Sequence, residues 1–155
     1  MDAYDASLTR SAAHIIGATV AIGGAAVGNY ALFAGGTVYS QINKDNVTSD
    51  VLAYDPSLTF TTAPLLSVAR ANVKGASAGN YALFAGGRAG SFCTTVDAYN
   101  ASLTRTTATA LSSTKNNSAA ATVGNHAIFV GNTASADIYD ASLTKTSAAI
   151  LSTAR

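Results

Sequence analysis

The sequence has no tryptophan and no glutamate, and both absences limit the folds that it can form. Charged residues make up 11% of the 155 residues, well below the usual quarter of a globular domain. Solvent-facing helices are normally rich in Glu and Lys, so the composition argues against a helical solenoid. The abundant Thr, Ser, Gly, Asn and Tyr favour short strands and tight turns instead.

The sequence also lacks any strong excess of charge, and it has a single cysteine. The net charge of +1 indicates neither nucleic acid nor an anionic membrane as a partner. Cys93 cannot form an intrachain disulfide. A reducing compartment is compatible with this, so the cytoplasm is favoured while the localisation stays unknown.

No Lys, Arg, Asp or Glu occurs between Arg10 and Lys44. Such a stretch could be a signal peptide or a membrane span. It is rich in glycine, however, and it aligns with later copies that carry Arg70, Lys74 and Lys115. A membrane helix would not share its pattern with charged, turn-rich copies, so we predict no membrane segment.

Two phrases repeat along the chain. Residues 28–36 and 79–87 are identical, GNYALFAGG, and 124–132 is the related GNHAIFVGN. The second phrase contains a tyrosine at positions 4, 54, 99 and 139, which are 50, 45 and 40 residues apart. Periods of this length are typical of β-propeller repeats, and helical repeats are mostly shorter.

Each unit is expected to contain four short strands. The alanine-rich first strands, 25–27, 76–78 and 120–123, should lie innermost, where propeller strands converge. A two-residue Gly-Asn turn should join each to a second strand, because both residues tolerate positive φ. We expect these second strands, at 30–34, 81–85 and 126–130, to be buried on both faces between neighbouring units.

The third strand of each unit ends near the repeated tyrosine, at 51–54, 96–99 and 137–139. The Asp-x-Ser-Leu-Thr motif that follows is a turn signal. The Asp or Asn oxygen can accept the N–H two residues on, and the Leu can pack back under the turn. The fourth strands are expected at 61–67, 106–112 and 146–152.

This order of features resembles a kelch-type β-propeller, in particular bacterial kelch-like repeats. The family hallmarks are a Gly-Gly pair after the second strand, a Tyr in the third strand and a basic residue after the fourth. They fall here on Gly35, Gly36, Gly86, Gly87, Tyr54, Tyr99, Tyr139, Arg70, Lys115 and Arg155. The resemblance implies structural roles for these residues. The family's Trp is missing, so Leu66, Leu111 and Leu151 would have to pack between units.

We therefore expect an all-β fold of kelch-like β-propeller blades, with about three four-stranded blades and an N-terminal half blade. The expected ranges within one repeat domain are 1–16 for the half blade and 20–69, 71–114 and 118–155 for the blades. A closed ring normally has four to eight blades. Either two copies complete a ring or the chain is a segment of a longer propeller, since open edges invite pairing.

No residue pattern predicts a catalytic site, a metal site or a cofactor. His126 replaces the Tyr of another copy, His14 has no acid or Cys at ligand spacing, and Cys93 has no neighbouring His. The repeated Asp5, Asp55 and Asp140 are explained by their turns.

The copies differ most between the second and third strands, in loops at 37–50 and 88–95. Loops on one face of a repeat protein commonly bind partners. The candidate binding residues are Tyr39, Gln41, Lys44, Asn46, Arg88 and Phe92. The alternative is that these loops are only solvated connections.

The first functional hypothesis is a non-catalytic module for protein binding or self-association through open blade edges. The absence of an acid–base constellation favours it. Two alternatives stay open: part of a propeller enzyme acting on sugars, as the resemblance implies, or a structural repeat of a larger surface protein.

Overall fold

The computed structural model describes residues 2–4, 10–12, 19–38, 46–115, 118–131 and 133–149. These residues form strands and turns without any helix, so the predicted all-β class is confirmed. In the same ranges there is accordingly no helix able to span a membrane.

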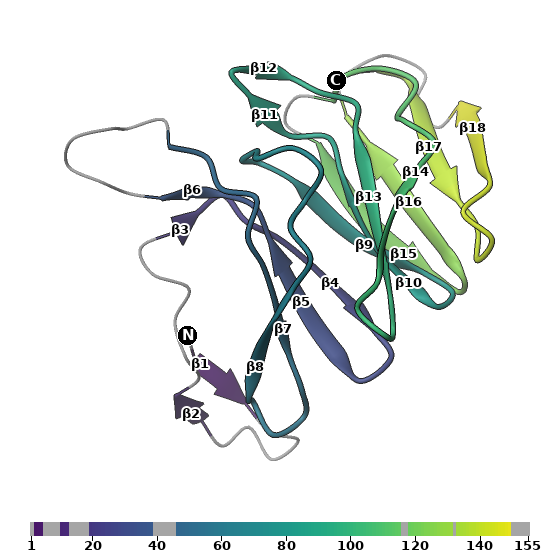
Figure 1. Ribbon diagram of the computed structural model, residues 1–155. Helices are drawn as coiled ribbons and strands as arrows, with labels where there is room; N and C mark the ends of the chain where they lie inside the picture. The colour runs from purple at the N-terminus through teal and green to yellow at the C-terminus, as the bar shows by residue number, and fades with distance from the viewer. Residues whose placement is uncertain are drawn as a thin grey trace.

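Twelve of the strands form three four-stranded antiparallel sheets (Figure 1). Sheet 1 contains β4 (Gly23–Val27), β5 (Tyr30–Ala34), β7 (Val51–Tyr54) and β8 (Phe60–Ala63). Sheet 2 contains β9 (Lys74–Ala78), β10 (Tyr81–Ala85), β13 (Val96–Asn100) and β14 (Arg105–Ala108). Sheet 3 contains β15 (Ala119–Val123), β16 (His126–Val130), β17 (Ser135–Tyr139) and β18 (Lys145–Ala149).

Six shorter strands form three antiparallel pairs beside these sheets. The pairs are β1 (Asp2–Tyr4) with β2 (Arg10–Ala12), β3 (Thr19–Val20) with β6 (Thr37–Val38), and β11 (Arg88–Ala89) with β12 (Ser91–Phe92). The β11–β12 hairpin is part of the connection between the second and third strands of sheet 2, where sequence analysis expected only a loop.

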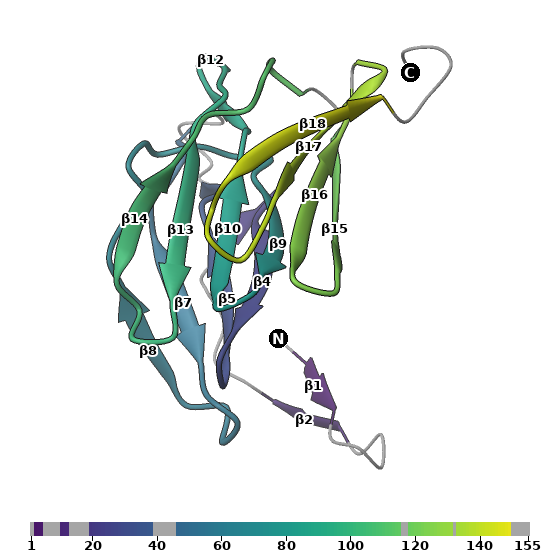
Figure 2. The same cartoon turned by 90° about the vertical axis from the view of Figure 1, so that its right-hand side faces the viewer.

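The first strands of the three sheets lie side by side, and the fourth strands lie outermost (Figures 1 and 2). The predicted innermost position of the alanine-rich strands is thus confirmed. Ser77 of β9 ties them together: its Oγ donates to the Ala26 carbonyl at 2.6 Å, and its N–H donates to Thr122 Oγ1 at 2.8 Å. The backbones are so close that a Cβ on Gly75 would lie 2.6 Å from the carbonyl carbon of Gly24.

The Gly-Asn pairs stand at the tips of two-residue hairpins, as predicted. The strands pair Val27 with Tyr30, Ala78 with Tyr81, and Val123 with His126. Only the glycine has a positive φ, between 52° and 54° in the three turns. A positive φ at the first central residue alone is the pattern of a type II′ turn, which glycine adopts without steric cost.

The Asp-x-Ser-Leu-Thr turns also form as predicted. In the turn of sheet 3, Asp140 Oδ1 accepts the N–H groups of Ser142 and Thr144 at 2.8 and 2.9 Å. The leucine at the fourth position has a positive φ in all three described turns, 63° at Leu58, 58° at Leu103 and 63° at Leu143. Sequence analysis missed this left-handed conformation, which costs roughly 1–2 kcal/mol in a residue with a Cβ.

Two of the fourth strands are shorter than predicted, and the predicted end of the third, at 150–152, lies outside the described residues. The strands β8 and β14 end at Ala63 and Ala108, four residues before the predicted ends at 67 and 112. The residues that follow leave the sheet because their backbone groups bond to other segments. The Leu66 N–H donates to the Ser49 carbonyl, and the Leu111 N–H donates to the Thr94 carbonyl.

Each sheet has two faces, and we call the one towards the next sheet along the chain its forward face. In sheet 1 the forward face consists of Val27, Leu32, Ala34, Val51, Ala53, Ala63 and Leu66, all buried. It packs against Ala82, Phe84 and Tyr99 on the backward face of sheet 2. The forward face of sheet 2 packs in the same way against Ala127, Phe129 and Tyr139 of sheet 3.

The prediction that every second strand is buried on both faces is wrong for two of the three. It holds for β10, where four of five residues are buried. In β5 and β16 burial alternates along the strand. The reason is position: among the described residues, sheet 2 has a four-stranded sheet packed on both sides, whereas sheets 1 and 3 each have one on a single side.

Candidate functional site

A buried ion network joins sheet 1 to sheet 2. The side chains of Arg70, in the link after β8, and of Asp97, on β13, are fully buried, with Arg70 Nη1 2.9 Å from Asp97 Oδ2. The remaining guanidinium hydrogen bonds, 2.8–3.1 Å long, go to the carbonyls of Val68, Phe84 and Gly86. Arg105 contacts the other Asp97 oxygen at 3.0 Å. Buried charges require such complete pairing, so Arg70 has a structural role.

A similar network joins sheet 2 to sheet 3. The Lys115 ammonium lies 3.4 Å from Asp137 Oδ2, and both side chains are almost fully buried. Lys145 approaches the second oxygen at 3.7 Å. Burial by itself would raise the pKa of Asp137, but hydrogen bonds from Ser112 and the charge of Lys115 outweigh it and hold that pKa below its ordinary value.

Sheet 1 has neither the acid nor the preceding cation that form these networks at sheets 2 and 3. The position two residues before the repeated tyrosine is Asp97 in sheet 2 and Asp137 in sheet 3, but Leu52 in sheet 1. Arg70 and Lys115 stand nine residues before a Gly-Asn turn, and the residue nine before the first such turn is Thr19. In the three four-stranded sheets, the acid of the third strand and the cation before the first strand are therefore either both present or both absent. The Asp two residues before the Tyr was visible in the sequence, and our sequence analysis overlooked it.

The repeated tyrosines connect neighbouring sheets through their hydroxyls. Tyr99 of sheet 2 donates to the Pro64 carbonyl at 2.8 Å, and Tyr139 of sheet 3 donates to the Thr109 carbonyl at 2.6 Å. Burial, followed by the nearby Asp97 or Asp137, raises the pKa of each phenol well above its ordinary value. Each ring also stacks edge-to-face on the phenylalanine of the second strand, with centroids 5.8 and 5.9 Å apart.

The repeated glycine pairs occupy the positions that a side chain would obstruct. Gly35, Gly36, Gly86 and Gly87 have φ values of 67°, 112°, 64° and 101°. The Gly36 N–H donates to the Arg70 carbonyl at 3.0 Å, which joins the glycine pair to the link between the sheets.

The predicted loop residues separate into three groups. Tyr39, Gln41 and Lys44 lie outside the described residues. Asn46 is exposed, and its carbonyl accepts the Val38 N–H at 2.9 Å. The other two come together, because Arg88 and Phe92 are cross-strand partners in the β11–β12 hairpin.

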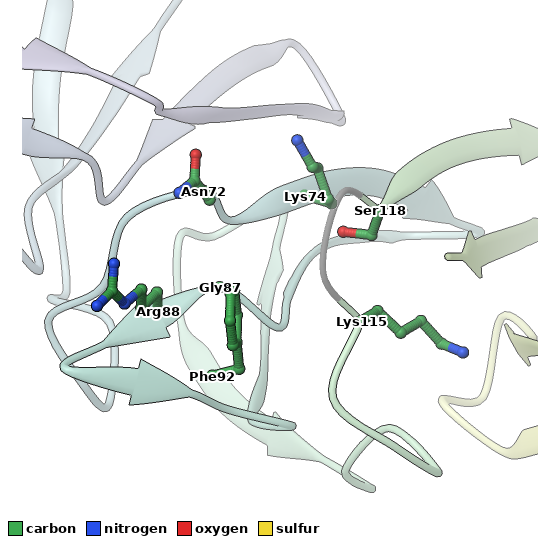
Figure 3. A pocket seen from close by; sticks show the side chains of 7 residues that line it. All are labelled: Asn72, Lys74, Gly87, Arg88, Phe92, Lys115 and Ser118. Carbon is green, nitrogen blue, oxygen red and sulfur yellow. The ribbon is translucent and has the colours of Figure 1, made fainter. Parts of the chain in front are cut away.

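Arg88 and Phe92 line a pocket of about 180 Å³ at the end of the sheets opposite the Gly-Asn turns (Figures 1 and 3). The other lining residues are Asn72, Lys74, Gly87, Lys115 and Ser118. Sequence analysis did not select Asn72, Lys74 or Ser118. Asn72 and Lys74 lie just before and at the start of β9 in sheet 2, and Ser118 lies just before β15 in sheet 3, so they meet Arg88 and Phe92 only in three dimensions. Figure 3 shows Lys74 and Asn72 on one side of the hollow and Gly87 with Phe92 on the other.

The histidine and cysteine that the structure describes do not form a metal cluster. The described ranges contain no group of three His, Cys, Asp or Glu side chains that could hold a metal ion. His126 is exposed at the start of β16. Cys93 is half-buried, and burial raises the pKa of its thiol.

The forward face of sheet 3 differs from those of sheets 1 and 2. At the equivalent positions it carries Val123, Ile128, Val130, Ala136, Ile138 and Ala148. Ala136 is buried, but Val123 is 59% exposed and the other four are half-buried. Ile128 and Ile138 are directly opposite each other on β16 and β17. They occupy the positions of Leu83 and Ala98 in sheet 2, which are fully buried.

Comparison of the sequence with protein-family models and with curated proteins finds no match.

Proposed function

We propose that the chain is a non-catalytic assembly module of kelch-like propeller repeats, in which the forward face of sheet 3 binds another blade of the same kind. The observation that carries the proposal is the half-exposed apolar surface formed by Ile128, Val130, Ile138 and Val123. Apolar side chains at the corresponding positions are buried wherever a following sheet is present. Contiguous apolar surfaces of this kind mark interaction sites.

The repeat itself indicates the chemistry of the partner. Sheets 1 and 2 each receive a backward face with Ala and Phe on the second strand and Tyr on the third, as in Ala82, Phe84 and Tyr99. A partner blade with these side chains would complete the burial of Ile128 and Ile138. Complete burial of an exposed Val or Ile side chain contributes about 1.5–3 kcal/mol, and these residues are partly buried already, so each would contribute a fraction of that.

The carboxylates of the described sheets support a non-catalytic role. Asp97 and Asp137 are held in the two buried ion networks. Asp55 and Asp140 accept the hydrogen bonds of their own turns. These four groups therefore have structural partners that explain their positions.

Self-association tests the proposal, because a second copy is the accessible source of another blade. Ile138→Lys puts a charge at the centre of the forward face. Leu65→Lys is the matched control, because Leu65 is 56% exposed and lies in the link after β8, away from that face. Sedimentation velocity over a range of concentrations should show association of the wild type and of Leu65→Lys, with association at least tenfold weaker in Ile138→Lys.

A wild type that stays monomeric up to millimolar concentration would overturn the proposal, as would unchanged association of Ile138→Lys. Circular dichroism and thermal melting must first show that each variant is folded. If Ile138→Lys does not fold, Ile128→Lys on the neighbouring strand tests the same surface.

A further inference from the structure

Two of the basic residues whose side chains the structure describes have no acidic partner among the described residues. Four basic side chains pair with the two buried aspartates: Arg70 and Arg105 with Asp97, and Lys115 and Lys145 with Asp137. Lys74 and Arg88 form no ion pair within the described ranges, and both line the pocket beside Phe92.

The backbone of Arg88 is hydrogen-bonded to the link between sheets 1 and 2. Its N–H donates to the Ala71 carbonyl at 2.8 Å, and its own carbonyl accepts the Ala71 N–H at 3.0 Å. Its Nε donates to the Gly90 carbonyl at 3.1 Å. The two terminal nitrogens of the guanidinium have no acceptor among the residues that the structure describes, so they are available to a ligand.

The two cations are also specific to the second repeat. Lys74 is replaced by Gly23 in sheet 1 and by Ala119 in sheet 3, five residues before the Gly-Asn turn. Arg88, which follows the Gly-Gly pair, is replaced by Thr37 and Thr133. Lys74 and Arg88 are therefore not part of the pattern that recurs in every repeat, as Tyr99 is, and residues that differ between copies are candidates for binding.

Lys115 contributes little charge to this pocket. Its ammonium is bound to Asp137 and points away from the hollow towards sheet 3 (Figure 3). The positive charge of the pocket therefore comes from Lys74 on one side and Arg88 at the rim. Arg88 and Asn72 also line a second hollow of about 180 Å³, next to Thr37 and Val47.

The exposed ring of Phe92 adds an apolar surface next to the two cations. Phe92 is 42% exposed, whereas most phenylalanine residues in folded proteins are buried. A pocket of about 180 Å³ is smaller than the usual site for a drug-sized ligand, so it can hold a single ring with its substituent. Asn72 and Ser118 supply polar groups at its edge.

We propose that the pocket formed by Lys74, Arg88 and Phe92 binds a small carboxylate ligand with a ring. Arg88 binds the carboxylate, since charge-assisted hydrogen bonds from a guanidinium fork suit its planar geometry. Lys74, on the other side of the hollow, adds positive charge that favours an anionic ligand. Phe92 packs against the ring. This site is separate from the forward face of sheet 3, so neither proposal depends on the other.

Benzoate and benzamide test the site on the complete chain, because they share a ring and a planar head group and differ in charge. Two-dimensional NMR titration should show benzoate binding with a Kd of about 1 mM, with the largest shifts at Lys74, Arg88 and Phe92. Benzamide should bind at least tenfold more weakly. Inorganic phosphate, an anion without a ring, should also bind at least tenfold more weakly than benzoate.

Variants of the two cations locate the binding. Lys74→Met and Arg88→Met should each weaken benzoate binding several-fold, and the double variant should abolish saturable shifts. Arg105→Met is the matched control, because it removes a cation that is paired with Asp97 and does not line the pocket, so it should leave benzoate binding unchanged. Thermal melting checks that all the variants are folded.

Three results would overturn the proposal. The first is equal binding of benzoate and benzamide, or no binding of either. The second is phosphate binding as tight as benzoate binding, which would indicate a simple anion site without a role for the ring. The third is wild-type affinity for benzoate in the folded double variant.

Discussion

Replacing Arg70 by methionine should destabilise the chain more than any other single change to a basic residue. The substitution removes four hydrogen bonds from a fully buried guanidinium, to Asp97 and to the carbonyls of Val68, Phe84 and Gly86. It leaves the buried Asp97 carboxylate with Ser67 and Arg105 as partners. Three backbone carbonyls also lose their bonds to Arg70.

The expected cost is about 3–5 kcal/mol, the usual penalty for removing one partner of a buried ion pair. A total stability of about 5–15 kcal/mol is typical of a domain, so the fold should be close to its limit. Asp97→Leu should cost a similar amount, since it leaves the Arg70 charge buried without a carboxylate. Sheet 1 shows that the pair can be replaced, because Leu52 occupies the position of Asp97 there.

The double variant Arg70→Met/Asp97→Leu should therefore cost at least about 2 kcal/mol less than the sum of the two single variants. Urea unfolding followed by circular dichroism gives the free energies of unfolding of the two single variants and the double variant. The comparison requires that the free energy depends on urea concentration with the same slope in each protein. Arg70→Lys is the control for charge, and we expect an intermediate loss because an ammonium cannot reproduce the planar fork of hydrogen bonds. Additive single effects, or a loss below about 1 kcal/mol in Arg70→Met, would refute the reasoning.

Two further predictions concern the hairpins and acid stability. Gly79→Ala should lower the free energy of unfolding more than Gly124→Ala. Both glycines have a φ near 53°, which should cost alanine roughly 1–2 kcal/mol. At Gly79 the new Cβ would also lie 2.9 Å from Ala141 Cα, whereas at Gly124 it would meet nothing within 4 Å. Equal losses in urea unfolding would contradict this steric explanation. The pKa of Asp137 is lower in the folded chain than in an unfolded one, so the stabilisation that it provides is present above about pH 4 and is lost as the pH falls further. Ser112→Ala removes one of the hydrogen bonds that lower this pKa and should make the loss of stability below pH 4 less steep. Urea midpoints between pH 2 and 6 measure the difference, and parallel curves for the two proteins would count against the assignment.

The predictable parts of this fold are those in which a few neighbouring residues determine the backbone. A Gly-Asn pair between two apolar runs specifies a hairpin wherever it occurs, because glycine adopts positive φ without a steric cost. In the same way Asp140 forms its turn through bonds to Ser142 and Thr144, which are two and four residues away. Repetition then identified the four-stranded unit, since three copies had to satisfy one pattern.

The candidate sites were only partly predictable. Arg88 and Phe92 were selected because their loop differs between copies, and the structure brings them together. Lys74 was not selected, because it belongs to a strand that otherwise looked structural. The lengths of the fourth strands β8 and β14 were also misjudged, since the backbone of Leu66 bonds to Ser49 of another segment, and that of Leu111 bonds to Thr94.

The amino-acid order alone therefore determined the strands and the turns, which depend on neighbouring residues, and the period of the repeat, which follows from the recurrence of the same short phrases along the chain. Tertiary structure decided which distant charges meet. Arg70 reaches Asp97 across 27 residues and is neutralised there, whereas no acid comes within reach of Lys74 and Arg88 among the described residues. The physical reason is that hydrogen bonds within a turn are chosen by local backbone geometry, whereas the partner of a charge is chosen by which sheets pack together.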